Sequence, residues 1–148
     1  MAQIGVAIIT EEALAAATVE TLIQLVAGAN HSIKILGWGV FFDGISATAE
    51  PVQVELLRQT TAGTSSALTL VKLNDSNGDT LDTTALQDFT AEPTASDILD
   101  MVEVHPQAGY EIKYPLGQEP ICGAGDRIGI RATAPAIVNA RAKIFFEE

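Results

Sequence analysis

Apolar and polar residues alternate along most of the chain, and this period-two pattern limits the folds that are open to it. The alternation is clearest in the run that ends the sequence, where Asn139, Arg141 and Lys143 stand between apolar neighbours. A period of two predicts a β-strand with one face in a core and the other wetter. The strongest runs lie at residues 33–42, 52–57, 110–114, 128–132 and 138–146, and shorter ones at 21–26, 67–73 and 101–105.

Turn signals rich in Gly, Asn, Asp and Pro separate these runs, and no helical pattern long enough for a βαβ unit occurs between them. We therefore predict an all-β chain, a single-domain antiparallel β-sandwich or jelly roll of about eight to nine strands spanning residues 1–148. One short stretch, 10–17, has the composition of a helix start, with Thr10 as cap. Residues 74–97 are acidic and irregular, which predicts either a loop that covers a neighbour or a crossover between sheets.

The charge balance excludes several classes of partner. Eight Lys and Arg stand against nineteen Asp and Glu, a formal net charge of −11. Phosphate backbones and anionic membrane surfaces repel such a chain, so we expect neither a nucleic-acid nor a membrane partner. The N-terminus lacks a basic region before its apolar stretch, so we expect no signal peptide, no spanning helix, and synthesis in a cytoplasm.

Residues suited to catalysis or metal binding are few. The two histidines, His31 and His105, are far apart in sequence, and Cys122 is the only cysteine, with no cationic cluster beside it. No nucleophile elbow, phosphate-binding lysine loop or ordered pair of carboxylates is present. We therefore expect no enzyme, cofactor, metal site or small-molecule substrate, and treat a metal-dependent cupin as the least favoured class.

Several apolar residues are instead candidates for a protein interface. Aromatic rings at Phe145 and its neighbour point to opposite faces of the last strand, so one must leave the core. Trp38 is a candidate anchor because tryptophan is common in binding hot spots, with a core position as the alternative. Residues 1–17 could form an N-terminal arm in which Ile4, Val6 and Ile8 pair with a neighbouring chain, or an edge strand of their own sheet.

Three segments resemble small proteins encoded among the head genes of tailed phages and prophages. They are KILGWGVFFDG, PVQVELLRQTTAGTSSAL and DRIGIRATAPAIVNARAKIFFEE, at residues 34–44, 51–68 and 126–148. The resemblance extends from about Thr18 to the C-terminus and includes no catalytic signature. It implies a capsid decoration, or cement, protein: a β-sandwich, commonly a homotrimer, that lies on the outer capsid surface of the virion.

This resemblance makes the major capsid protein the expected partner, with the chain clamping neighbouring copies and stabilising the head. A low content of charged residues, 18%, agrees with a surface that is buried against other proteins, and equally with an ordinary β-domain rich in Thr and Ala. The alternative is a trimeric receptor- or glycan-binding jelly-roll module, such as a fibre tip. That alternative needs exposed aromatic residues in loops, and Phe89 is the main candidate for one.

Overall fold

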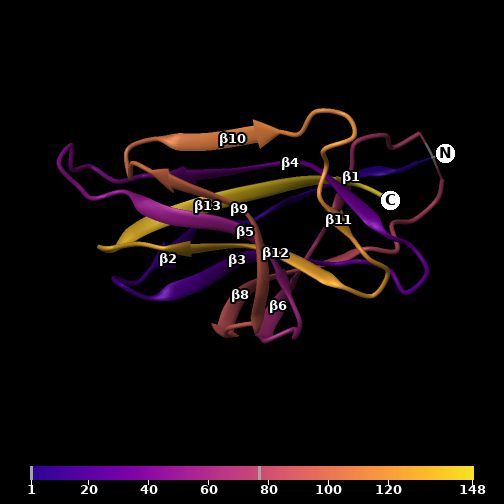
Figure 1. Ribbon diagram of the computed structural model, residues 1–148, viewed down its shortest axis with the longest axis horizontal. Coiled ribbons are helices and arrows are strands. Elements are labelled where there is room, and N and C mark those ends of the chain that lie inside the picture. Colours follow the sequence, from indigo (N-terminus) through magenta and orange to yellow (C-terminus); the bar gives the residue numbers. More distant parts are fainter. Residues whose placement is uncertain (1, 77) are drawn as a thin grey trace.

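The chain forms a sandwich of two antiparallel β-sheets without a helix, as a computed structural model of residues 2–76 and 78–148 shows (Figure 1). One sheet has seven strands and the other six, so the prediction of an all-β sandwich is confirmed. The strands are β1 (Ile4–Ile8), β2 (Glu12–Leu14), β3 (Val19–Val26), β4 (Ile33–Phe42), β5 (Val52–Gln59), β6 (Thr64–Leu68), β7 (Val71–Lys72), β8 (Thr84–Ala91), β9 (Ala95–Val104), β10 (Gly109–Lys113), β11 (Ile121–Cys122), β12 (Arg127–Thr133) and β13 (Val138–Glu147).

Eight of these strands pair in a nested order that defines a jelly roll. β1 pairs with β13, β3 with β12, β4 with β10, and β5 with β9. The chain is thus one long antiparallel ribbon rolled into two layers. The order is β10-β4-β13-β1-β7 in the seven-stranded sheet and β6-β8-β3-β12-β5-β9 in the six-stranded sheet.

Alternate side chains of the paired strands fill the space between the layers. In β13 the buried residues are Val138, Ala140, Ala142, Ile144 and Phe146, as the period-two pattern predicts. Partners from the facing sheet include Ile23, Leu25, Ile128 and Ile130, all of them fully buried. Because both sheets supply branched aliphatic side chains, the core is continuous from β3 to β13.

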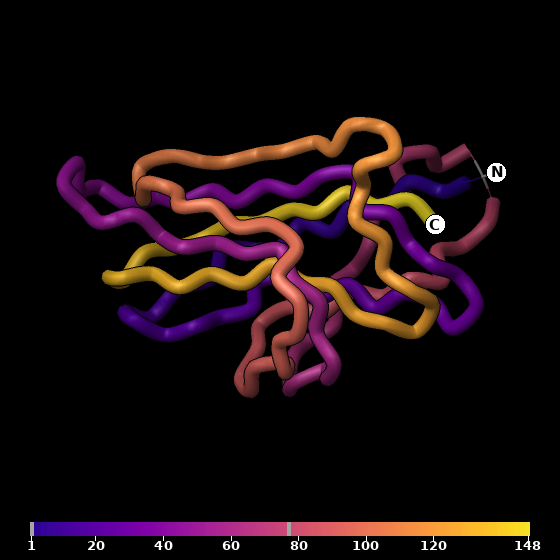
Figure 2. Tube along the Cα trace, in the orientation of Figure 1, coloured from indigo at the N-terminus to yellow at the C-terminus, as the bar shows by residue number. Residues whose placement is uncertain are grey.

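The N-terminal segment is part of the sandwich, so the arm hypothesis is not what the structure shows. Ile4–Ile8 forms β1, which lies between β13 and β7 of its own sheet. Backbone hydrogen bonds connect Gln3 with Glu148, so the two ends of the chain lie side by side (Figure 2). The helix predicted at 10–17 is also wrong: Glu12–Leu14 pairs with the first half of β13, and this pairing outweighs the local helix signal.

Residues 60–94 form an insertion between β5 and β9 that contains β6, β7 and β8. The segment expected to be irregular, 74–97, contains β8 and the first three residues of β9, and Asn77 lies outside the described residues. β8 pairs with β3 only through Ala85 and its two neighbours, and then leaves the sheet together with β6. Asp88 adopts a positive φ of 53° where β8 departs. Phe89, expected in a loop, lies in β8 and is buried.

A buried polar network crosses the outer face of the six-stranded sheet beneath the insertion. Gln24 Nε2 donates to Gln59 Oε1 at 2.8 Å, and Gln59 Nε2 donates to Thr21 Oγ1 at 3.1 Å. The Thr21 hydroxyl and backbone N–H donate to the carboxylate of Glu92, from the β8–β9 turn. Gly129 makes room for this network, because a Cβ there would lie 2.4 Å from Gln59 Oε1.

Candidate interaction surface

The outer face of the seven-stranded sheet gathers most of the interface candidates. Residues of β1 that point away from the core are Ile4, Val6 and Ile8, because Gly5 and Ala7 point inward. Val6 lies opposite Phe145 of β13 on one side and Val71 of β7 on the other. We call this surface the β1 face; its members are Ile4, Val6, Ile8, Leu36, Val71, Leu73 and Phe145.

Three aliphatic side chains of the β1 face are strongly exposed. Ile8, Val71 and Leu73 each keep 57% of their surface accessible, and Ile4 keeps 38%. Next to them Ile4, Leu36, Leu73, Lys113 and Phe145 line a depression of about 200 Å³. Exposed apolar side chains that adjoin one another in this way are characteristic of protein interaction sites.

Two interface candidates do not belong to the accessible part of this surface. Val6 is buried between its neighbours on the β1 face, so a partner could reach little of it. Trp38 is fully buried on the opposite side of the sheet, in the core, and the expectation of an interface anchor is wrong. It lies there because its pairing partner Ile144 also points inward.

Trp38 takes part in a hydrogen-bond relay that joins the two layers. Its Nε1 donates to the Tyr114 hydroxyl at 3.0 Å, and that hydroxyl donates to Asp100 Oδ2 of β9 at 2.8 Å. Burial and, secondly, the hydrogen bond to Asp100 raise the pKa of Tyr114 above its usual value. The tyrosine therefore stays protonated and continues to donate to the carboxylate.

Two lysine side chains contact aromatic rings on this side of the sheet. Lys143 Nζ is 5.3 Å from the ring centroid of Phe41, 5.4 Å from that of Phe145, and 2.7 Å from Glu111 Oε2. The ion pair with Lys143 lowers the pKa of Glu111. Lys113 Nζ lies 5.8 Å from the Phe145 ring, a cation–π geometry.

The charge on this side of the sheet differs from that of the rest of the chain. The outward cations are Lys34, Lys113, Arg141 and Lys143, and the carboxylates paired with them are Glu11, Glu111 and Glu147. Asp43 adds a fourth carboxylate on this side, where it accepts hydrogen bonds from the backbone N–H and the Nδ2 of Asn139. Among the described residues, Lys113 is the one of these four cations that makes no ion pair, and it lines the depression of the β1 face.

A second apolar surface lies at one end of the sandwich, where three loops meet. Ile45 of the β4–β5 loop is 95% exposed, and Ile137 of the β12–β13 loop is 79% exposed. Together with Pro106 and Pro135 they line a hollow of about 150 Å³. We call residues 44–50, 106 and 135–137 the loop end.

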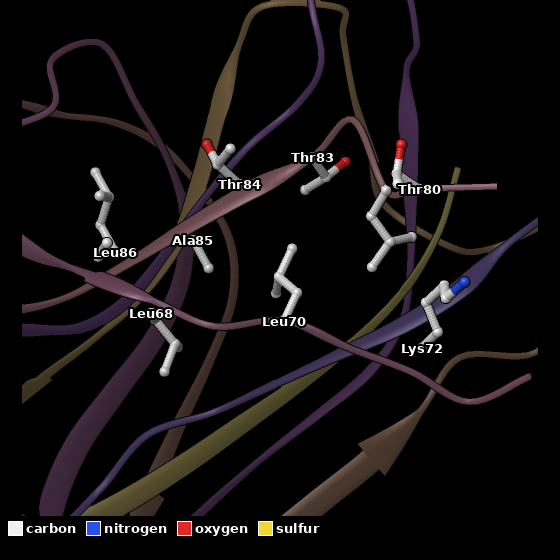
Figure 3. Close-up of a pocket in the computed structure, with 10 residues that line it drawn as sticks. Leu68, Leu70, Lys72, Thr80, Thr83, Thr84, Ala85 and Leu86 are labelled. Atoms are coloured by element: carbon white, nitrogen blue, oxygen red, sulfur yellow. The ribbon is translucent and has the colours of Figure 1, made fainter. Parts of the chain in front are cut away.

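The cavity beside β6, β7 and β8 has no catalytic arrangement among the residues that line it. It measures about 440 Å³ and opens where β6 and β7 cross from one sheet to the other, with Leu68 and Leu70 on one side and Thr83, Thr84 and Ala85 on the other (Figure 3). The only charged side chain in its lining is Lys72, whose Nζ donates to the Asp79 carbonyl oxygen at 2.8 Å. This cavity is an opening of the hydrophobic core.

The remaining candidates for chemistry are separated from one another. His31 contacts Asp82 at 3.0 Å, and His105 lies at 3.3 Å from the Ala47 carbonyl oxygen. Cys122 is buried, and this burial raises the pKa of its thiol to about 11, which disfavours the nucleophilic thiolate. Among the described residues, no three His, Cys, Asp or Glu side chains are grouped so that they could hold a metal ion.

One carboxylic acid titrates unusually. Burial, followed by hydrogen bonding and repulsion from Glu20 and Asp88, raises the pKa of Glu12 to about 7. The three side chains come from β2, β3 and β8, so the cluster forms only where β8 leaves the sheet. It was not predicted because the three residues are distant in sequence.

Comparison with protein-family models, with curated proteins and with solved structures finds no significant match to this chain. In residues 2–76 and 78–148, no helix is long and apolar enough to cross a membrane. The functional argument therefore depends on the surfaces described above.

Proposed function

We propose that this chain is a structural phage protein that decorates the outer capsid surface and stabilises the head. Its partners are copies of the major capsid protein and copies of itself, as a homotrimer in the virion. The observation that carries the proposal is the exposed apolar β1 face on a sandwich that has few charged residues. Covering such a surface with another protein removes apolar area from water and so lowers the free energy.

The separation of the two apolar surfaces supports a clamping role. An oligomer that clamps neighbouring subunits needs one surface for its own copies and another for the shell, and the β1 face and the loop end lie on different parts of the sandwich. The net charge of −11 favours a position outside the shell, because packaged DNA repels it. Binding only to the assembled lattice would stabilise the head by mass action.

The test is co-sedimentation of the purified chain with expanded heads assembled from the major capsid protein of the same genome. We expect binding and a higher melting temperature of the heads. The variants Ile45→Asp and Ile137→Asp should weaken binding if the loop end meets the shell. Leu116→Asp is the matched control, because Leu116 is 93% exposed and lies outside both surfaces.

A wild-type chain that stays in the supernatant and leaves the melting temperature of the heads unchanged would contradict the proposal. In that case the same protein should be screened against glycans, the ligands of the alternative class.

A further inference from the structure

A third surface, on β9, carries carboxylates, whereas the charged side chain that lines the depression of the β1 face is Lys113. Ile98 and Met101 are 51% and 57% exposed. They lie opposite Leu57 and Glu55, which point away from the core, so they face outward as well. Asp97 and Glu103 flank them on the same strand. We call these four residues, Asp97, Ile98, Met101 and Glu103, the β9 strip.

The sequence around the β9 strip is strongly acidic. β9 contains three carboxylates, Asp97, Asp100 and Glu103, and no Lys or Arg. Arg131 of β12 is paired with Glu55, and Arg58 of β5 donates to the Ile121 carbonyl oxygen. The β9 strip therefore combines two exposed apolar side chains with an uncompensated negative charge.

The two surfaces lie at opposite corners of the sandwich. β1 and β7 are at one lateral edge of the seven-stranded sheet, whereas β9 is the edge strand of the six-stranded sheet on the side of β10. The Tyr114–Asp100 hydrogen bond places β9 next to the end of β10. One molecule cannot bring its own β1 face onto its own β9 strip.

We propose that the β1 face of one copy docks on the β9 strip of a second copy. In this contact Ile8, Leu73 and Phe145 cover Ile98 and Met101, and the exposed Lys113 lies against Glu103. The inference rests on the part of the proposed function that joins copies of the chain. It adds that the contact is head-to-tail, so each copy uses both surfaces and the copies close into a ring.

Charge selects this contact over the two symmetric ones. A pairing of two β1 faces would bring lysines together, and a pairing of two β9 strips would bring carboxylates together. Apolar side chains occur on both surfaces, so burial is available in each case, and only the head-to-tail pairing also matches the charges.

The test measures mass in solution by light scattering for the wild type, Ile8→Asp and Met101→Asp. Each substitution should convert the oligomer into monomers. An equimolar mixture of the two variants should then form a dimer, because one copy keeps an intact β9 strip and the other an intact β1 face. Leu116→Asp is the control and should retain the wild-type mass.

A charge exchange tests the electrostatic part without adding a buried charge. Lys113→Glu should weaken the oligomer at least tenfold at low salt, as should Glu103→Lys, and the double variant should recover most of the loss. Circular dichroism and the fluorescence of Trp38 show whether each variant is folded.

Three results would overturn the inference: a monomeric wild type, an oligomer that survives both Ile8→Asp and Met101→Asp, or variants that stay monomeric when mixed. A monomer that still co-sediments with heads would remove the head-to-tail contact and leave the decorating role in place. An oligomer that does not bind heads would remove the decorating role and leave the head-to-tail contact in place.

Discussion

Replacing Tyr114 with phenylalanine removes one hydroxyl that two partners on different strands share. The Trp38 indole N–H, fully buried, would lose its acceptor, and Asp100 would lose a donor. An unsatisfied buried donor costs about 1–3 kcal/mol, whereas half-buried Asp100 can regain water at little cost. We expect Tyr114→Phe to lower the free energy of unfolding by about 2 kcal/mol, or the melting temperature by about 4–8 °C.

Urea unfolding followed by tryptophan fluorescence suits this measurement, because Trp38 is the only tryptophan of the chain. Tyr110→Phe is the matched control: its ring lies 5.4 Å from that of Trp38, and its hydroxyl makes no hydrogen bond among the described residues. The control should change stability by less than about 0.5 kcal/mol. Equal losses in the two variants would show that ring packing, and not the relay, joins β9 to the other layer.

Two further substitutions test the polar network and the titrating acid. Gly129→Ala would force Gln59 out of the network by overpacking, and we expect it to lower the free energy of unfolding by about 2–3 kcal/mol in thermal or urea unfolding. Gly78→Ala, with open space around it, is the control and should be neutral. Equal effects of the two substitutions would contradict the crowding argument. Glu12 has a pKa of about 7 in the folded chain, against 4.5 for an ordinary glutamate, so the native state binds the Glu12 proton more tightly than the unfolded state does. The wild type should therefore lose stability as the pH rises from about 4.5 to 7. Urea unfolding at pH 5 and pH 8 should show that Glu12→Gln removes this loss of stability, whereas the control Glu11→Gln does not. A wild type with equal stability at both pH values would refute the raised pKa of Glu12.

Most of the sandwich can be predicted from the period-two pattern because its strands are half buried. In β13 every second side chain is in the core, and the alternation reports this directly. The pattern fails where pairing partners outweigh local preference. Glu12–Leu14 looks like a helix start, yet it completes the sheet beside β13. The left-handed backbone of Asp88 interrupts the alternation of β8, so the period-two pattern does not predict this strand within its acidic segment.

The interaction surface can be predicted only in part, for a related reason. The exposure of Ile4, Ile8 and Phe145 follows from their places on strands, but the side of the sheet that Trp38 faces depends on its register with β13. The contribution of Val71 depends on the pairing of β7 with β1, which is determined by contacts across more than 60 residues of sequence. The β9 strip was missed because its alternation is interrupted by irregular pairing with β5.

The nested pairing of the strands also determines the order of events during synthesis. β13 lies between β1 and β4, so the centre of the seven-stranded sheet cannot form until the ribosome has released residues 138–147. Because translation proceeds at about 5–20 residues per second, the edges of β1 and β4 that pair with β13 stay unpaired for several seconds. We therefore expect slow folding dominated by distant contacts, and a nascent chain that depends on chaperones until its last strand is inserted.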